Sequence, residues 1–343
     1  MSLFLDAARG VDTPRAPIWL MRQAGRYMPE YRALKEKYTF WQLCQNPELA
    51  AEVTLQPIDF LGVDAAILFS DIMTPLSSMG AEIDFKPGPV IANPVRSQAA
   101  VDALRVPETE AIAPFVGETI AILRGELKVP LIGFGGAPLT LATYLVEGSG
   151  SKDYPLFRQF LYAEEAAAHA LLGKLAEVSI RYLRMQVEAG AQAIQLFDSW
   201  AGLYDLERYR TFGAAYARQV FEGLADLDVP RIYIAVGASH LLEAIAELPV
   251  DVVSADWRLP LSQVRARLPE GMALQGNLDP AALLAPKTQI QARARHVLVE
   301  GLGGAHIFNL GHGIMRQSPP DHVKCLVDTV QAFDRRAHAV EGS

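Results

Sequence analysis

The sequence has little cysteine, no long apolar run and no excess of positive charge. Its 343 residues include only two cysteines, Cys44 and Cys325, whose spacing resembles no metal site. Two thiols in so long a chain suit a reducing compartment, so we expect a cytoplasmic protein. Without a run of 18 apolar residues or a secretory signal at the start, we expect neither a membrane span nor export. The formal net charge of -8 argues against a nucleic-acid surface.

What the chain does contain is enough apolar sequence for a large core. Half of its residues are hydrophobic and 20% are charged, a balance that excludes a disordered tail protein. The length suits one (β/α)8 barrel with extensions. No linker rich in Pro, Gly or Ser divides it, so we expect residues 1–343 to form a single domain.

Eight short apolar runs alternate with longer amphipathic stretches and predict a parallel sheet. The runs are rich in Val, Ile, Leu and Phe without strict alternation, which is typical of strands buried on both faces. We therefore predict an α/β fold, a closed (β/α)8 TIM barrel; an open doubly wound sheet is the alternative, because periodicity does not show closure. The predicted strands are Pro17–Leu20, Ala65–Phe69, Pro130–Phe134, Ala193–Phe197, Arg231–Val236, Val252–Ala255, Met272–Gln275 and Ala305–Asn309.

Polar residues and glycines follow each of these strands. In a (β/α)8 barrel the C-terminal ends of the strands meet at one rim, where active sites are built, so these residues should converge on one mouth. Gly301–Gly304 precedes the last strand and belongs to the opposite end, where we expect a helix stop and a turn. Ser77–Thr109, with several prolines, reads as an irregular excursion.

Three arginines follow the first strand within residues 21–32. Arg22, Arg26 and Arg32 carry permanent charges on planar forks of donors, which suit carboxylate or phosphate. Positive charge gathered in an acidic chain favours an anion-binding site. The alternative is that these side chains form exposed ion pairs, which stabilise a protein by only about 0–1 kcal/mol.

Two acidic residues follow buried strands. Asp71 comes after Ile67-Leu68-Phe69-Ser70 and either caps the next helix or faces a ligand. A buried carboxylate needs partners or a shifted pKa, and a ligand with several N–H donors would be a suitable partner. Of the pair Asp198 and Ser199, we expect Asp198 to be the helix cap.

The remaining candidates are weak when read from the residues alone. Tyr144 is best interpreted as a core aromatic residue. Ser199 lacks the Gly-x-Ser-x-Gly surroundings of a nucleophile elbow. His312 lies between Gly311 and Gly313, which open space around it, although a lone histidine is more often structural than catalytic.

Two segments resemble signatures of the uroporphyrinogen decarboxylase family. They are residues 21–32, MRQAGRYMPEYR, and residues 133–144, GFGGAPLTLATY. Further segments match around Asp71, Ser199 and His312, and one departure is Leu139, where the family often has Trp.

The resemblance implies a role for each candidate site residue. Arg22 and Arg26 would hold substrate carboxylates, and Asp71 would accept hydrogen bonds from pyrrole N–H groups. Tyr144, Ser199 and His312 would contact the substrate. Asp71, Arg22 and Tyr144 are the expected catalytic residues.

The implied reaction converts the four acetate side chains of uroporphyrinogen III to methyls, giving coproporphyrinogen III and carbon dioxide in haem and tetrapyrrole synthesis. No cofactor is expected, since the protonated pyrrole can itself accept the electron pair. No metal, nucleic acid or membrane partner is expected, and the family is typically a homodimer.

Two other functions stay open from the sequence. A corrinoid-dependent methyltransferase would share the fold but needs thiol-rich zinc ligands, which two cysteines do not provide. A tetrapyrrole carrier without catalysis would use the arginines but has no need for Asp71 in a buried mouth.

Overall fold

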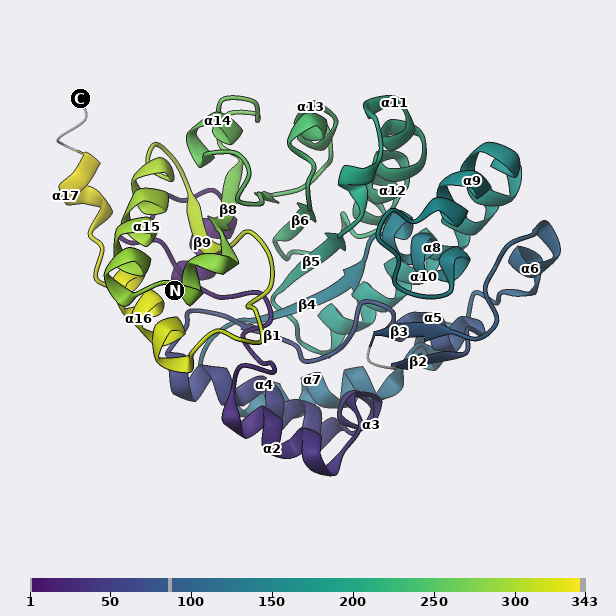
Figure 1. Ribbon diagram of the computed structural model, residues 1–343, viewed down its shortest axis with the longest axis horizontal. Helices are drawn as coiled ribbons and strands as arrows, with labels where there is room; N and C mark the ends of the chain where they lie inside the picture. The colour runs from purple at the N-terminus through teal and green to yellow at the C-terminus, as the bar shows by residue number, and fades with distance from the viewer. Residues whose placement is uncertain (1, 86–87, 340–343) are drawn as a thin grey trace.

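The computed structural model describes residues 2–85 and 88–339 and has a barrel-like parallel sheet with helices outside it (Figure 1). Seven parallel strands are hydrogen-bonded in the order β1-β4-β5-β6-β7-β8-β9. They are β1 (Ala66–Ile67), β4 (Leu131–Gly136), β5 (Ala193–Asp198), β6 (Arg231–Ala235), β7 (Val252–Ser254), β8 (Ala273–Leu278) and β9 (His306–Leu310).

Residues 17–20 take the eighth position and close the ring between β9 and β1. The Phe308 N–H donates to the Pro17 carbonyl at 2.8 Å, and the Asp64 N–H donates to the Ile18 carbonyl at 2.8 Å. This pairing confirms the (β/α)8 barrel and excludes the open doubly wound sheet. The predicted first strand is shorter than expected, a single bridge between Ile18 and Phe308. Pro17 has no N–H to donate, and the backbone leaves the extended region at Arg22, where φ is 62°.

Helices cover the outside of the sheet (Figure 1). The α-helices are α1 (Leu3–Ala8), α2 (Pro29–Lys37), α3 (Phe40–Gln45), α4 (Pro47–Leu61), α5 (Thr74–Met79), α6 (Gln98–Ala103), α7 (Pro114–Glu126), α8 (Pro138–Glu147), α9 (Pro155–Ala163), α10 (Glu165–Ala189), α11 (Leu206–Arg208), α12 (Ala215–Glu222), α13 (Leu242–Ala246), α14 (Leu261–Arg265), α15 (Lys287–Glu300), α16 (Pro320–Gln331) and α17 (Arg335–Ala339). The short 3₁₀ helices are η1 (Thr109–Ala111), η2 (Ala201–Leu203), η4 (Ser239–Leu241) and η5 (Pro280–Leu284), and η3 (Tyr209–Ala214) is a π-helix. Among the described residues no helix is long and apolar enough to cross a membrane.

The structure shows the form of two connecting segments considered in the sequence, residues 77–109 and residues 301–304. The excursion at residues 77–109 is more regular than expected, because β2 (Ile83–Phe85) and β3 (Pro89–Ile91) pair as an antiparallel hairpin there. Gly301 caps the C-terminus of α15, and Gly303 and Gly304 have positive φ, which confirms the predicted helix stop and turn.

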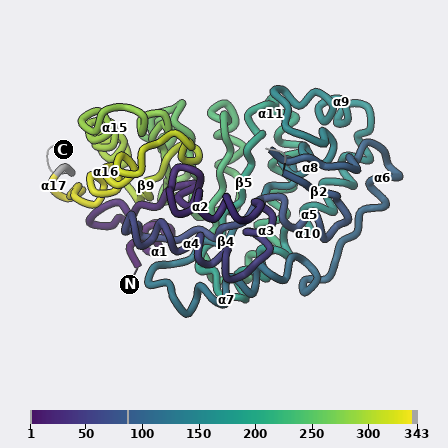
Figure 2. Tube along the Cα trace, turned by 60° about the horizontal axis from the view of Figure 1, so that its bottom comes forward, coloured from purple at the N-terminus to yellow at the C-terminus, as the bar shows by residue number. Residues whose placement is uncertain are grey.

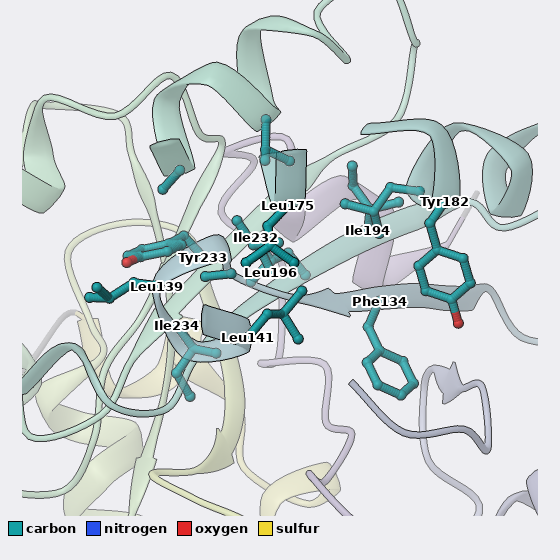
Figure 3. Close-up of a cluster of buried hydrophobic side chains, with 14 of the residues drawn as sticks. Phe134, Leu139, Leu141, Leu175, Tyr182, Ile194, Leu196, Ile232, Tyr233 and Ile234 are labelled. Carbon is teal, nitrogen blue, oxygen red and sulfur yellow. The ribbon is translucent and has the colours of Figure 1, made fainter. Parts of the chain in front are cut away.

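The strands are buried on both faces, as predicted for a parallel sheet. Ile194, Leu196, Ile232 and Ile234 are at most 1% exposed, and they lie in one cluster with side chains of α8 and α10 (Figure 3). Truncating such a residue to alanine costs about 2–5 kcal/mol, so this packing fixes the strand ends that carry the site.

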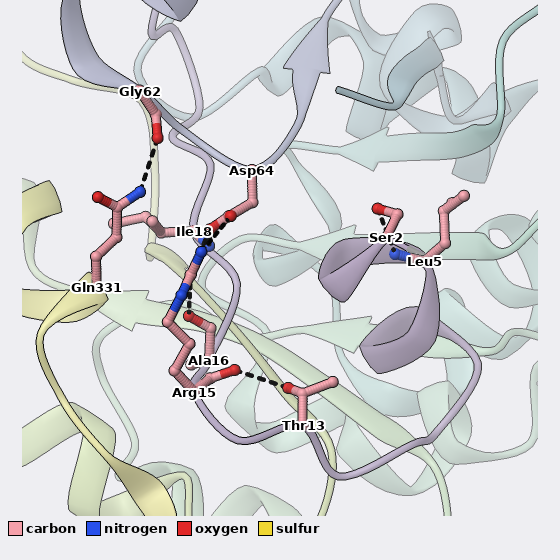
Figure 4. A network of polar contacts seen from close by, with 9 residues as sticks. All are labelled: Ser2, Leu5, Thr13, Arg15, Ala16, Ile18, Gly62, Asp64 and Gln331. Carbon is pink, nitrogen blue, oxygen red and sulfur yellow. Dashed lines mark hydrogen bonds and ion pairs between the residues drawn. The ribbon is translucent and has the colours of Figure 1, made fainter. Parts of the chain in front are cut away.

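One ion pair anchors the segment that closes the barrel (Figure 4). The two Arg15 Nη atoms donate to the two Asp64 carboxylate oxygens at 2.8 and 2.6 Å, and the Ile18 N–H donates to Asp64 Oδ2 at 2.8 Å. The Asp64 side chain is only 15% exposed, so this bidentate pair is screened less than a surface pair.

We predict that Asp64→Ala lowers the free energy of unfolding by about 2–3 kcal/mol, because Arg15 and the Ile18 N–H lose their acceptor. Chemical denaturation measures the change. Asp59→Ala, at an exposed position of α4, is the control and should change it by less than about 0.5 kcal/mol. Equal effects of the two substitutions would show that the pair does not hold the barrel closed.

Candidate active site

A cleft of about 1340 Å³ opens at the C-terminal ends of the strands, as the barrel prediction requires. Ligand pockets for drug-sized molecules span about 300–1,000 Å³, so this cleft suits a larger ligand. All six residues predicted for the site line it: Arg22, Arg26, Asp71, Tyr144, Ser199 and His312.

Two segments far apart in the sequence meet at this cleft. The N-terminal segment that precedes α2 lies beside the C-terminal part of the chain in Figure 2, where the Ile314 N–H donates to the Met21 carbonyl at 2.9 Å. This contact brings Arg22 next to the loop that carries His312. A Cβ atom on Gly313 would lie 2.3 Å from Arg22 Cδ, so only glycine leaves room for the Arg22 side chain there.

Asp71 lies just beyond β1 and faces the cleft, half-buried. Its Oδ1 accepts the Met73 N–H at 2.9 Å. The cap of α5 is Met73, so Asp71 closes a turn before the helix and is not the helix cap of the alternative reading. Burial raises the pKa of Asp71 to about 6, against the opposing effects of the Met73 N–H and the Arg22 charge.

Arg22 and Arg26 are exposed to the cleft. Neither forms an ion pair with any residue that the structure describes, so the surface ion-pair alternative finds no partner there. Their guanidinium donors therefore face a cleft in which an anion can bind.

Tyr144 and His312 offer neutral polar groups. Burial raises the pKa of the Tyr144 phenol, and its ring packs edge-on to Tyr154 and Trp200 with centroids 6.1 and 6.0 Å apart. Burial, together with the charge of Arg22, lowers the pKa of His312 to about 4. At neutral pH these side chains can exchange hydrogen bonds without adding charge.

Sequence reasoning missed further cations in the cleft lining. Lys35 and Lys37 lie in the last turn of α2, and Arg316 follows the His312 loop. Burial and repulsion by Arg26 lower the pKa of Lys35, which shows how closely the positive charges gather. The basic residues of 22–37 form one run in the sequence, so this charge pattern could have revealed the two lysines; no comparable signal marks Arg316.

The lining also includes an apolar wall that the sequence did not suggest. Phe40 packs edge-on against Phe69 and Phe85, with centroids 5.8 and 4.8 Å apart, and all three rings line the cleft. The cleft therefore pairs a cationic side with an aromatic side, which suits a ligand with an apolar body and anionic arms.

The expectation that Asp198 caps a helix is wrong. Its carboxylate is fully buried and accepts hydrogen bonds from the Thr140 and Tyr233 hydroxyls, each at 2.7 Å. Burial raises the pKa of Asp198 to about 6. The carboxylate points into the protein because β5 continues through residue 198, one residue further than predicted.

The described residues contain no group of three or more His, Cys, Asp or Glu side chains suited to a metal ion. Cys44 is buried and Cys325 half-buried, and both are free thiols. The zinc ligands that the methyltransferase alternative requires are therefore not found in residues 2–85 or 88–339.

Comparison with known proteins gives one family. The family model for uroporphyrinogen decarboxylase (URO-D) matches residues 1–333. The uroporphyrinogen decarboxylase of Geobacter metallireducens is 49% identical over 336 residues, 97% of this chain and 99% of the relative. That of Trichlorobacter lovleyi is 48% identical over 336 residues, with the same coverage of both chains.

Solved structures share the fold at lower identity. A methyltransferase from Methanosarcina mazei has a TM-score of 0.78 at 22% identity, covering 96% of this chain and 98% of its own. A B12-independent methionine synthase from Shewanella has a TM-score of 0.61 at 11% identity, covering 89% and 91%. At such identities the likeness shows the fold alone.

We predict that Asp198→Asn changes how stability depends on pH. The pKa of Asp198 is higher in the folded protein than in the unfolded chain, so ionisation costs the folded state more. The wild-type free energy of unfolding should therefore fall, relative to that of the variant, by about 2 kcal/mol between pH 4 and pH 7. Denaturant unfolding of both proteins across this range measures the difference. A difference that is flat or rises with pH would contradict it.

Proposed function

This chain belongs to the uroporphyrinogen decarboxylase family, and from that membership and the cleft we propose that it decarboxylates the four acetate side chains of uroporphyrinogen III to methyls, giving coproporphyrinogen III. It is thus a carboxy-lyase of tetrapyrrole biosynthesis. The observation that carries the proposal is a single desolvated carboxylate, Asp71, in a cleft whose described lining has five Lys or Arg residues and only three Asp or Glu.

The cationic lining matches the charge of the substrate. Uroporphyrinogen carries eight carboxylates around an apolar macrocycle. In the proposed complex Arg22 and Arg26 hold carboxylates through bidentate hydrogen bonds, while the aromatic wall around Phe40 packs against the ring. Fixed carboxylates also determine which acetate reaches the reacting position.

The chemical problem is where the electron pair goes when carbon dioxide leaves. A proton added to a pyrrole ring carbon gives a cationic ring next to the acetate. The C–C bond to the carboxylate then breaks, and its electron pair neutralises the ring. A proton added to the resulting exocyclic methylene, and loss of the ring proton, give the methyl, so each carbon dioxide released consumes one proton overall.

Asp71 would stabilise this ring cation. In the ground state its carboxylate accepts pyrrole N–H hydrogen bonds, and as the ring becomes cationic the same hydrogen bonds gain the attraction between opposite charges. A charged group that is already in place where the opposite charge develops in the transition state usually makes the largest contribution to catalysis. With a pKa of about 6, Asp71 is ionised at neutral pH and ready for this role.

We propose supporting roles for Tyr144, Ser199 and His312 as neutral groups in contact with the substrate. The phenol and hydroxyl donate hydrogen bonds, and His312, uncharged at neutral pH because its pKa lies near 4, can donate or accept. With Asp71 and Arg22, Tyr144 is one of the three residues that we propose to act in the chemical step.

The wider assignments are also proposals. We propose that the chain acts as one domain, without a cofactor, as a cytoplasmic homodimer. The family resemblance supports the dimer, and two free thiols support a reducing compartment. The solution mass from light scattering tests the dimer.

We predict that Arg22→Lys and Arg26→Lys each lower kcat/KM by about tenfold or more, because lysine keeps the charge but not the bidentate fork. Anaerobic assays, with products separated by carboxylate number, measure the change. Arg210→Lys is the control: its two Nη atoms bind Glu247 at 2.7 Å each on the surface, outside the cleft, and activity should persist. Wild-type kinetics in both cleft variants would contradict the anion-site assignment.

We predict that Asp71→Asn slows the chemical step much more than it weakens substrate binding. Loss of one charge-assisted contact in a desolvated site costs on the order of 3 kcal/mol, or roughly a hundredfold in rate. Single-turnover rates and substrate affinity measure the two effects. Asp205→Asn is the control, since Asp205 likewise accepts a backbone N–H, that of Arg208 at 2.9 Å, outside the cleft. Near-normal turnover of the Asp71 variant would refute its catalytic role and leave it a turn residue.

A further inference from the structure

A chain of buried hydroxyls and one carboxylate joins four elements, α8, β5, β6 and η3, beneath the cleft. The Thr140 hydroxyl, on α8, donates to Asp198 Oδ1 at 2.7 Å and accepts a hydrogen bond from the backbone N–H of Trp200 at 3.3 Å. The Tyr233 hydroxyl, on β6, donates to Asp198 Oδ2 at 2.7 Å, and the hydroxyls of Tyr233 and Tyr209 are 2.8 Å apart. Asp198 is therefore the junction between α8, β5 and β6.

This network lies directly behind two residues proposed to contact the substrate. Thr140 and Tyr144 are four residues apart on α8 and therefore share one face of the helix. Ser199 follows Asp198 at the end of β5. One hydrogen bond between Thr140 and Asp198 thus connects the helix face that carries Tyr144 with the strand end that carries Ser199.

None of these groups can touch a ligand in the cleft. Thr140, Asp198, Tyr209 and Tyr233 are each 0% exposed, and none of them lines the cleft. A buried carboxylate costs free energy that an apolar residue of similar shape would not. Because the Asp198 carboxylate lies behind the site, we expect it to serve the function of the site and not the stability of the fold.

We infer that Thr140 and Asp198 are positioning residues, whose hydrogen bond holds Tyr144 and Ser199 in the arrangement that the reaction requires. This inference rests on the proposed function, because the contact of Tyr144 and Ser199 with the substrate is itself part of that proposal. A small displacement of such groups is sufficient to slow a reaction by up to about a hundredfold.

The chain offers matched variants for a test. Thr140→Val removes the hydroxyl that joins α8 to β5, and Thr140→Ser keeps it. Thr143→Val is the control, because Thr143 is equally buried on the same helix but its hydroxyl donates to the Leu139 carbonyl of that helix, at 2.7 Å, and not to Asp198. We expect Thr140→Val to lower kcat by about tenfold, with Thr140→Ser and Thr143→Val within about threefold of wild type.

The role through Tyr144 is read from a double-mutant cycle. If Thr140 acts by positioning Tyr144, adding Thr140→Val to the Tyr144→Phe variant should lower kcat by at most about twofold. Circular dichroism checks that the single and double variants are folded. An equal loss in both backgrounds would overturn the inference, as would full activity of Thr140→Val or unchanged activity of Tyr144→Phe.

Substrate affinity, measured in the same variants under anaerobic conditions, gives the coupling between Thr140 and Tyr144 a second time, from binding instead of kcat. A wild-type protein that binds the substrate but releases no carbon dioxide would refute the proposed function. The positioning role would then be decided by affinity, where independent effects of Thr140→Val and Tyr144→Phe would overturn it.

Discussion

The site depends on one opposition of charges: the desolvated carboxylate of Asp71 beside the guanidinium of Arg22. Burial raises the pKa of Asp71 to about 6, while the hydrogen bond from the Met73 N–H and the charge of Arg22 both oppose that rise, so the carboxylate stays ionised at neutral pH. A carboxylate in this cleft repels a polyanionic ligand. In the proposed complex the arginines compensate for that repulsion by binding the substrate carboxylates, which leaves Asp71 to attract the positive charge that develops on the ring.

The barrel makes this opposition possible because it brings distant segments together. Arg22 comes from the segment that closes the ring, Asp71 from the end of β1, and the His312 loop follows β9. The Asp64 carboxylate contributes to closure, because it binds Arg15 and the Ile18 N–H a few residues before Arg22. The position of the arginine is therefore a consequence of the same contacts that complete the barrel.

Most of the barrel could be predicted from the sequence, because apolar runs identify buried strands and the residues after them share one rim. Arg22, Asp71, Ser199 and His312 follow such strands and line the cleft. Tyr144 was a candidate only through the family resemblance, because its residue type and position alone predict a core aromatic side chain. The side-chain partners could not be predicted. Asp198 followed by Ser199 looked like a helix cap, and only the packing of α8 and β6 around β5 shows a buried acceptor for two hydroxyls. Lys35 and the aromatic wall were missed because strand ends alone do not show which neighbouring helix faces the mouth. The proline-rich excursion concealed a hairpin for a similar reason, since its register depends on pairing.

The most direct test is a pH titration of the Asp71 carboxylate by NMR of protein labelled with ¹³C-aspartate, with Asp71→Asn used to assign the signal. We expect a pKa of about 6 in the wild-type protein. We expect a higher value in Arg22→Gln, because the guanidinium that favours the ionised form is gone. A wild-type pKa near 4 that does not respond to Arg22→Gln would contradict the account, since Asp71 would then be an ordinary solvated carboxylate.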